Sequence, residues 1–283
     1  MSRCLDLSRL KKGRYSREIE SLESLLSGRR VAVGYSGGVD STLLAVLARE
    51  FSEASAAITV VSPLLSKRDL QRAKSLAAQL GLRHFSINMD LLSEPAVKRN
   101  LSDRCYHCKR SIYSRLIEEA RKMGLEAVLD GSNADDILEN RPGLKAVREL
   151  GIETPLAQVG LGKPAVREIS RRIGLPTWNQ PSNSCLATRI PSGRPLTPAG
   201  LSRVERAESL LAALGYQVFR VRDHGDIARV ELGPDDLGQL DLDKLASQIV
   251  DRFREIGYRR VCVDLSPYRH PEHHQSTGRR SET

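Results

Sequence analysis

Apolar and polar residues follow one another along this chain in segments that predict a repeated order of strand and helix. Short apolar runs at 31–34 and 57–61 have the length of buried strands, a further strand is expected at 83–88, and 127–133 read as a strand that runs into a polar turn. Apolar side chains recur with helical spacing in longer segments, at 15–27, 42–48, 103–123 and 163–174 and in a helix that ends at Leu80. This alternation is typical of an α/β fold with a doubly wound parallel sheet.

The pattern changes in the last third of the chain. Residues 218–222 and 227–232 alternate in side-chain character as paired strands do, and 223–226 supply a turn between them. We expect two helices and a last strand around this pair, at 198–214, 242–256 and 260–265. These elements predict a small α+β domain that follows the parallel sheet.

The Pro-, Asn- and Ser-rich segment at 176–185 marks a connector between the two patterns. We therefore predict a first domain at 1–180 and a smaller second domain at 181–265. The polar residues at 266–283 are expected to form a disordered tail.

A glycine pair follows the first apolar run. Residues 35–41, called the glycine loop below, read Tyr-Ser-Gly-Gly-Val-Asp-Ser and lead into a predicted helix. Gly37 and Gly38 allow a tight turn whose N–H groups approach an anion, and the helix directs its positive end to the same place. Asp40 would repel a phosphate directly, so a Mg²⁺ bridge or a helix-capping role suits it better. The chain contains no G-x-x-x-x-G-K-[ST] loop with its phosphate-binding lysine.

The motif S-G-G-x-D-S resembles the PP-loop of ATP pyrophosphatases. That resemblance implies cleavage of ATP between the α- and β-phosphates, with pyrophosphate held in the loop and AMP left on a substrate oxygen. It also implies a set of residues that bind the phosphates and their Mg²⁺, namely Ser36, Gly37, Gly38, Asp40 and Ser41. A bare glycine pair would be an ordinary turn, but six positions match in the expected strand–loop–helix setting.

Composition limits the possible partners. Lys and Arg number 44 and Asp and Glu 35, so the net charge is +9, which suits nucleotides, phosphorylated metabolites or RNA. Aromatic residues are only 4% and no dense basic block contains them, so the charge argues weakly for nucleic acid. No apolar run approaches the ~20 residues of a membrane span, and the N-terminus lacks a signal-peptide core. We expect a cytoplasmic protein without a membrane partner, whose five cysteines are not in structural disulfides.

Cys105 and Cys108 form a C-x-x-C motif at the start of a predicted helix. Zinc, a redox disulfide, an iron–sulfur cluster and simple packing all fit such a motif, although no second C-x-x-C completes a four-thiolate zinc site. Cys185 is the other cysteine in a polar context. Cys4 lies near the N-terminus, and Cys262 lies in an apolar strand and is expected in the core. Three thiolates suit a [4Fe–4S] cluster with one open iron, since full ligation takes four.

Further motifs lie at 129–133, 141–144, 184–191 and 220–232. Together with the glycine loop they resemble LarE, a family of ATP-dependent sulfur transferases that help to build the nickel-pincer nucleotide cofactor. The resemblance covers about residues 15–265. Its most specific part is R-x-R-x-H-x-D-I-A-R-x-E within 220–232, which general PP-loop enzymes lack.

The LarE resemblance implies a mechanism. ATP adenylates a carboxylate of pyridinium-3,5-dicarboxylic acid mononucleotide, and sulfur then attacks the acyl-AMP to give a thiocarboxylate. Some members sacrifice a cysteine sulfur and become dehydroalanine, whereas others use three cysteines and a [4Fe–4S] cluster. Cys105, Cys108 and Cys185 indicate the cluster type, and sacrifice of Cys185 stays open as the alternative. ATP, Mg²⁺ and the cluster are thus the implied cofactors, and a homo-oligomer is the family precedent.

Roles are assigned by position. Ser62, at a strand end, and Gly131, after another strand, are expected to border the adenosine. Arg220 and Arg222 alternate on one strand face, so both can point at one anionic group of the substrate. With Asp40 and Cys185 they are the candidate catalytic residues. Weaker candidates, which have surface ion pairs as their simpler interpretation, are Arg189, Glu208, Asp226, Arg229 and Glu231.

Three other functions remain as alternatives. A tRNA-thiolating enzyme also combines a PP-loop with C-x-x-C and a third cysteine, but the chain has few aromatics, no RNA-binding appendage and the LarE-like string, so RNA is not an expected partner. An amide-forming synthetase would need an ammonia source and no cysteine cluster. In a nucleotide-binding regulatory module, mutation of the loop would change partner binding without changing any turnover.

Overall fold

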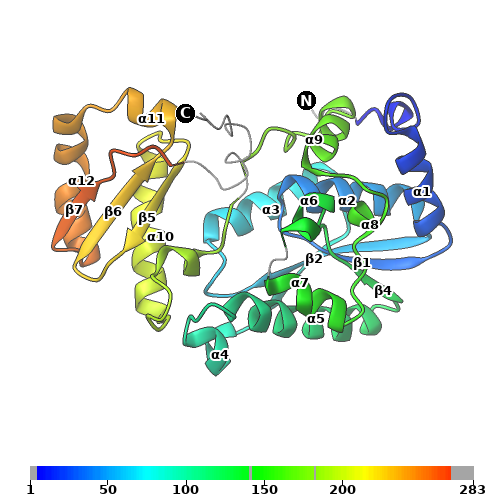
Figure 1. The fold of residues 1–283 in the computed structure, drawn as a ribbon, viewed down its shortest axis with the longest axis horizontal. Helices are drawn as coiled ribbons and strands as arrows, with labels where there is room; N and C mark the ends of the chain where they lie inside the picture. The colour runs from blue at the N-terminus through cyan, green and yellow to red at the C-terminus, as the bar shows by residue number, and fades with distance from the viewer. Residues whose placement is uncertain (1–4, 140–141, 182, 269–283) are drawn as a thin grey trace, which may run out of the picture. The chain divides into compact units, whose positions relative to one another are not determined.

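The computed structural model describes residues 5–139, 142–181 and 183–268 (Figure 1). The chain divides into two compact units, Met1–Asn183 and Ser184–Thr283. Cys4, Arg141 and residues 269–283 of the tail expected at 266–283 lie outside the described residues. Within the described ranges, no helix has the length and apolar character needed to cross a membrane.

The first unit is built on four parallel strands in the order β3-β2-β1-β4. Their bounds are β1 Arg30–Gly34, β2 Ala54–Val61, β3 His84–Asn88 and β4 Ala127–Leu129. In the centre, Val33 of β1 pairs with Ala57 of β2 on one side and with Leu129 of β4 on the other. The parallel α/β sheet expected from the sequence is confirmed. Because the strand order reverses next to β1, its carboxyl end lies at the point where open α/β sheets bind ligands.

Helices cover both faces of this sheet (Figure 1). One face carries α1 Ser16–Leu26, α2 Val39–Phe51, α3 Lys67–Gln79 and α9 Lys163–Arg172. The other face carries α5 Arg104–Lys122 and α7 Pro142–Glu149. Val33 belongs to the first hydrophobic cluster and the preceding Ala32 to the second, because successive strand residues point to opposite faces.

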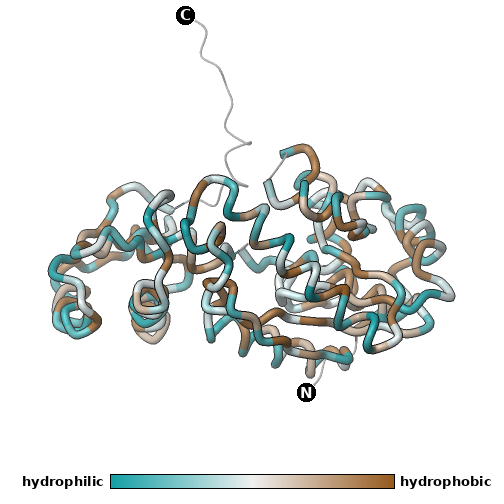
Figure 2. Tube along the Cα trace, turned by 90° about the horizontal axis from the view of Figure 1, so that it is seen from below, coloured by the Kyte–Doolittle hydropathy of each residue, from teal (hydrophilic) through white to brown (hydrophobic). Residues whose placement is uncertain are grey.

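Short helical segments complete the first unit. They are η1 Leu7–Arg9, η2 Leu91–Ser93, α4 Pro95–Lys98, α6 Ala134–Leu138 and α8 Pro155–Gln158. Hydrophobic and hydrophilic residues alternate along the longer helices (Figure 2), so that each helix has one face for the sheet and one for solvent. Helix α7 was not expected, because the sequence around it reads as a polar segment.

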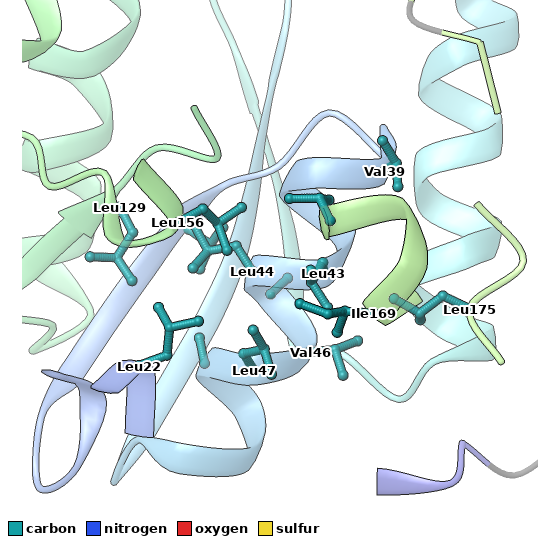
Figure 3. Packing of buried hydrophobic residues seen from close by; sticks show 14 of the residues in the cluster. Leu22, Val39, Leu43, Leu44, Val46, Leu47, Leu129, Leu156, Ile169 and Leu175 are labelled. Atoms are coloured by element: carbon teal, nitrogen blue, oxygen red, sulfur yellow. The ribbon is translucent and has the colours of Figure 1, made fainter. Parts of the chain in front are cut away.

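Helix α2, which follows the glycine loop, is the most deeply buried element of this unit. All its residues from Ser41 to Ala48 are buried, and its leucines pack against Leu22 of α1 and Ile169 of α9 (Figure 3). Burial of a leucine side chain contributes about 1.5–3 kcal/mol, so α2 is strongly held in place. Its first turn therefore presents the glycine loop from a rigid base.

The second unit contains a three-stranded sheet in the order β5-β6-β7. Its elements are η3 Leu186–Arg189, α10 Pro198–Ala213, β5 Phe219–Asp223, β6 Ile227–Leu232, α11 Pro234–Gly238, α12 Leu242–Ile256 and β7 Arg260–Val263. Strands β5 and β6 form the expected antiparallel pair, and β7 runs parallel to β6. Apolar residues of α10 and α12 pack with one face of this sheet, which leaves the opposite face to polar residues.

The prediction for Cys262 is wrong. Its side chain is exposed and not in the core. Strand β7 is an edge strand in which Val261 and Val263 are half-buried, and Cys262, between them, points to the other face. The register places Cys262 beside Arg229 of β6, on the polar face of the sheet.

Candidate functional site

The glycine loop turns sharply between β1 and α2. Gly37 has φ +72°, a conformation that favours glycine, and Gly38 is the N-cap residue of α2. A Cβ on Gly37 would lie 3.0 Å from the Cα and the Cβ of Ala73 in α3. The loop can therefore reach this position only without a side chain at 37, as the sequence predicts.

The hydroxyls of Ser36 and Ser41 hydrogen-bond to each other and to the backbone of Gly38. Ser36 Oγ lies 3.0 Å from Ser41 Oγ and accepts from the Gly38 N–H at 3.3 Å. The Ser41 hydroxyl also donates to the Gly38 carbonyl oxygen at 3.3 Å. These bonds fix the backbone at the start of α2, where the helix dipole and first-turn N–H groups favour an anion.

Asp40 lies in the first turn of α2 and does not cap the helix. Its Oδ2 accepts from Lys163 Nζ at 2.6 Å, and its Oδ1 accepts from Asn133 Nδ2 at 3.1 Å. Lys163 and Asp40 are largely buried, with side chains 16% and 20% exposed. Three segments far apart in the sequence thus meet at this carboxylate.

Lys163 is a residue of this site that the sequence did not predict. This residue is the first residue of α9, after the N-cap Gly162, and its backbone N–H donates to Asp135 Oδ2 at 2.7 Å. A lysine at a helix N-terminus faces the positive end of the helix dipole, which is unfavourable without a compensating anion. The unfavourable position of a lysine at a helix N-terminus was the signal in the sequence that a nearby anion is needed. The structure shows that this anion is Asp40.

The turn after β4 supports the glycine loop from the adjacent strand. Asn133 caps α6 in a reciprocal capping box with Asp136, which orients the amide that donates to Asp40. A Cβ on Gly131 would lie 3.0 Å from Ser41 N, so glycine is needed for this close approach. Ser62 lies just after β2, and its Oγ accepts from the Leu64 N–H at 3.3 Å. Ser62 and Gly131 both lie at the carboxyl edge of the sheet.

Asp130 anchors the same turn to helix α5. Its carboxylate accepts from Lys109 Nζ at 3.1 Å, from the Tyr113 hydroxyl and from the Ser132 N–H at 2.7 Å. Burial alone would raise the pKa of Asp130, but the Lys109 ammonium and the hydrogen bonds lower it below 3.8. Burial and the Asp130 charge raise the pKa of Tyr113 well above its ordinary value, so it stays a hydroxyl donor.

We expect Asp130→Asn to lower the free energy of unfolding at pH 7 by about 2 kcal/mol, because an ammonium loses its buried charge partner. The folded state depresses the pKa of Asp130, so its contribution is present above pH 3.8 and is lost as the pH falls below that value. Urea unfolding of both proteins from pH 7 downward measures this difference. A difference that stays constant below pH 3.8 would contradict the assignment.

The C-x-x-C motif lies in the first turns of α5, directly before Lys109. Cys105 is exposed and Cys108 is half-buried, and Arg104 donates to Cys105 Sγ at 3.6 Å. Tyr106 donates to Glu149 Oε2 of α7 at 2.6 Å, which links this turn of α5 to α7. Because Lys109 bonds Asp130 at the carboxyl edge, the motif and the glycine loop lie at the same end of the first unit.

Metal-ligating groups do not gather within either unit. Among the described residues, no three His, Cys, Asp or Glu side chains lie close enough together to hold a metal ion. Cys105 and Cys108 belong to the first unit and Cys185 to the second.

Cys185 begins the 3₁₀ turn η3 and is exposed. Its carbonyl oxygen accepts from Arg189 Nη1 at 3.0 Å and from the Thr188 hydroxyl at 2.8 Å. Arg189 also donates to the Ser184 hydroxyl at 2.9 Å. The guanidinium therefore holds the backbone on both sides of the thiol and leaves the thiol itself accessible.

Arg189 and Glu208, two of the weaker candidates, form a buried ion pair, so the simpler interpretation as a surface ion pair does not apply to them. Their side chains are 1% and 7% exposed, and Arg189 Nε donates to Glu208 Oε1 at 2.9 Å. The same oxygen accepts from the Val221 N–H at 3.2 Å. Glu208 therefore connects the Cys185 turn to strand β5, next to Arg220 and Arg222.

Arg220 and Arg222 lie on the polar face of β5, as their spacing predicts. Both guanidiniums lie over the Tyr268 ring, 4.8 and 6.0 Å from its centroid. Arg220 is 7% exposed, and burial together with the nearby Arg189 lowers its pKa. Arg222 is more open and bonds Glu231 Oε2 at 2.9 Å and the Thr188 carbonyl oxygen at 2.8 Å. Arg220 and Arg222 are called the arginine fork below. Through the Thr188 carbonyl, Arg222 links this fork directly to the turn that begins at Cys185.

The remaining charged candidates of the second unit differ in setting. Arg229 extends the same sheet face and pairs with Glu231 at 2.8 Å. Asp226 lies in the hairpin turn and forms an exposed pair with Arg259 at 3.6 Å, as a surface ion pair would. Arg229 and Glu231 thus belong with the fork, and Asp226 does not.

Comparison with known proteins assigns the chain, including its second unit, to one family. The asparagine synthase family matches residues 20–173, which contain the parallel sheet and the glycine loop. The pyridinium-3,5-bisthiocarboxylic acid mononucleotide synthase of Lactiplantibacillus plantarum is 35% identical over 243 residues, 85% of this chain and 87% of the relative. The chain belongs to the LarE family. The uncharacterized protein slr1717 of Synechocystis sp. is 38% identical over 240 residues, 84% of this chain and 90% of the relative.

LarE membership and the PP-loop domain make this chain an ATP-dependent enzyme. A more distant relative is the tRNA-specific 2-thiouridylase MnmA of Leptospira biflexa, which is 25% identical over 193 residues. That match covers 54% of this chain and 51% of the relative, at a lower identity than the 35% of the bisthiocarboxylic acid mononucleotide synthase. The tRNA-thiolation alternative is therefore less supported.

Proposed function

We propose that this protein is an ATP-dependent sulfur transferase that acts on pyridinium-3,5-dicarboxylic acid mononucleotide. It adenylates one substrate carboxylate and then exchanges the AMP for sulfur, which gives a thiocarboxylate. The observation that carries the proposal is the glycine loop with Asp40 held between Asn133 and Lys163, in a chain whose LarE relative is named as a bisthiocarboxylate synthase.

The first step needs positive charge around the leaving pyrophosphate. The N–H groups of the glycine loop and the N-terminus of α2 supply part of it. Asp40 would bind the Mg²⁺ that accompanies the nucleotide, and Lys163 would then turn from Asp40 to a phosphate oxygen. In this proposal Lys163 provides the cation that the chain lacks at the lysine position of a G-x-x-x-x-G-K-[ST] loop. Ser62 and Gly131 would border the adenosine at the edge of the sheet.

The substrate brings one phosphate and two carboxylates, which suit arginine. Arg222 is open enough to meet an anion, and a guanidinium binds carboxylate or phosphate through two parallel hydrogen bonds. Its bond to the Thr188 carbonyl would keep the bound anion near the Cys185 turn. Arg220 is buried and stacks on the Tyr268 ring. It would add a second positive charge beside Arg222.

Cysteine chemistry supports the choice of sulfur as the nucleophile. Cys105, Cys108 and Cys185 would hold a [4Fe–4S] cluster, which would supply the sulfide for the transfer. Two observations support this donor set: Cys105 and Cys108 are one helical turn apart on α5, and both Cys105 and Cys185 are exposed. In the alternative, Cys185 itself gives up its sulfur and becomes dehydroalanine.

Incubation with ATP and the dicarboxylate mononucleotide tests the function. We expect AMP, pyrophosphate and a thiocarboxylate product in equal amounts, measured by chromatography and mass spectrometry. ADP as the nucleotide product, or thiolated tRNA in place of a thiocarboxylate, would show that the assignment is wrong.

We expect Arg222→Ala to raise the KM for the mononucleotide by about 10–100-fold, because the variant loses charge-assisted hydrogen bonds to the substrate. The KM for ATP should stay unchanged. Arg222→Lys should recover little, because an ammonium cannot form the two-pronged contact. The matched control is Arg254→Ala, an exposed arginine of α12, which should behave as the wild type. Equal KM values for Arg222→Ala and the control would reduce Arg222 to a structural ion pair.

A further inference from the structure

The second unit contains a pocket on the side of β5 that faces away from Arg220 and Arg222. Its volume is about 490 Å³, and it lies between the start of α10, the end of β5 and the segment after η3. Successive residues of a strand point to opposite faces, so Asp223 enters this pocket while Arg222 points to the polar face. The pocket is therefore separate from the arginine fork.

Positive charge exceeds negative charge in the pocket lining. Arg194, Arg203 and Arg206 contribute +3 and Asp223 contributes −1, so the net charge is +2. The exposed Arg206 side chain forms no ion pair with any residue in the described ranges. Such a concentration of guanidinium groups in a concave site favours a bound anion.

Asp223 acts as the anchor of two of these arginines. Its carboxylate accepts from Arg203 Nε and Nη2, at 3.0 and 2.6 Å, from Arg194 Nη1 at 3.1 Å and from the Gly225 N–H at 2.8 Å. The Arg203 guanidinium also lies 4.6 Å from the centroid of the Tyr258 ring. The carboxylate and the ring hold Arg203 in one orientation, so little side-chain freedom remains to be lost on ligand binding.

The N-terminus of α10 opens into the same pocket. Thr197 caps the helix by accepting from the Gly200 N–H at 3.0 Å, and Ala199 and Gly200 line the pocket wall. The positive end of a 16-residue helix adds to the field of the three guanidiniums. Ser202 supplies a hydroxyl on the same wall.

We propose that this pocket is a second anion site, which binds a phosphate group. Arg206 and Arg194 at its mouth and the first turn of α10 would contact the phosphate oxygens, while Asp223 keeps Arg203 in place behind them. The phosphate could be that of free inorganic phosphate or of a small phosphomonoester, whose organic part would lie against Ile190, Pro195 and Ile256. This site does not depend on the proposed sulfur transfer.

Arginine-labelled ¹⁵N NMR of the full chain tests the site directly. The Arg203 Nε–H, which is hydrogen-bonded to Asp223, is assigned by its loss in Arg203→Lys and followed during titration with inorganic phosphate at constant ionic strength. We expect a saturable shift, which Arg206→Glu weakens by about tenfold or more. The control Arg252→Glu, at an exposed arginine of α12, makes the same charge change and should leave the shift as in the wild type.

A parallel titration with AMP distinguishes the two phosphate sources. Saturation at lower AMP than phosphate concentration assigns the site to phosphomonoesters, and equal or weaker AMP binding assigns it to free phosphate. The proposal is overturned if neither ligand moves the Arg203 signal, or if Arg206→Glu and Arg252→Glu titrate alike. Arg222→Ala should leave this titration unchanged, since that residue lies on the opposite face of β5.

Discussion

Lys163→Met is expected to slow ATP cleavage by about 10²–10³-fold, the usual effect of removing one preorganised charge from a reacting centre. The reason is the position of Lys163 Nζ, 2.6 Å from Asp40 Oδ2 in the first turn of α2. There the ammonium can neutralise charge that develops on pyrophosphate as it leaves. The rate of AMP formation with saturating substrate measures the effect.

The matched control is Lys122→Met, which removes an exposed lysine at the far end of α5. It should cleave ATP at the wild-type rate. Urea unfolding of both variants shows whether any loss reflects unfolding. A folded Lys163→Met protein with the wild-type rate would remove this lysine from the mechanism. Asp40→Asn, which removes the carboxylate proposed to hold Mg²⁺, should abolish turnover.

Alanine at Cys105, Cys108 or Cys185 is expected to abolish thiocarboxylate formation while pyrophosphate release persists. The two activities separate because the glycine loop lies between β1 and α2 and is held by its own serines and by Asn133 and Lys163. Product mass spectra and pyrophosphate release, measured on the same anaerobic samples, give both activities. Each variant should also lose protein-bound iron and sulfide.

Cys262→Ala provides the control, because Cys262 is exposed on β7 and has no place in the proposed chemistry. It should keep both iron and sulfur transfer. If the wild type holds no iron, and turnover removes one H₂S in mass from Cys185, then Cys185 is the sacrificial donor and the cluster proposal fails. If Cys105→Ala and Cys108→Ala keep full sulfur transfer, the motif serves packing alone.

The parallel sheet and the glycine loop could be predicted because local rules determine both. Buried strands of a parallel sheet are continuous apolar runs, and only glycine tolerates the φ of +72° at Gly37 together with contact to Ala73. The arginine fork could be predicted for a similar reason, because the i, i+2 spacing of a strand puts Arg220 and Arg222 on one face.

Contacts between distant segments could not be predicted in the same way. Lys163 meets Asp40 across 123 positions, and no local pattern connects them. Arg189 and Glu208 stayed weak candidates because single charged residues usually lie on the surface, and the sequence does not show that these two form a buried pair. Cys262 was misplaced because an apolar run was taken for a buried strand, although β7 is an edge strand.

Oxygen transfer from a labelled substrate tests the central claim most directly. In the proposed mechanism a carboxylate oxygen attacks the α-phosphorus of ATP, and sulfur later displaces AMP together with that oxygen. Pyridinium-3,5-dicarboxylic acid mononucleotide labelled with ¹⁸O in its carboxylates should therefore yield AMP that carries one ¹⁸O, detected by mass spectrometry. AMP without ¹⁸O, formed at the same rate as the thiocarboxylate, would contradict adenylation of the substrate carboxylate.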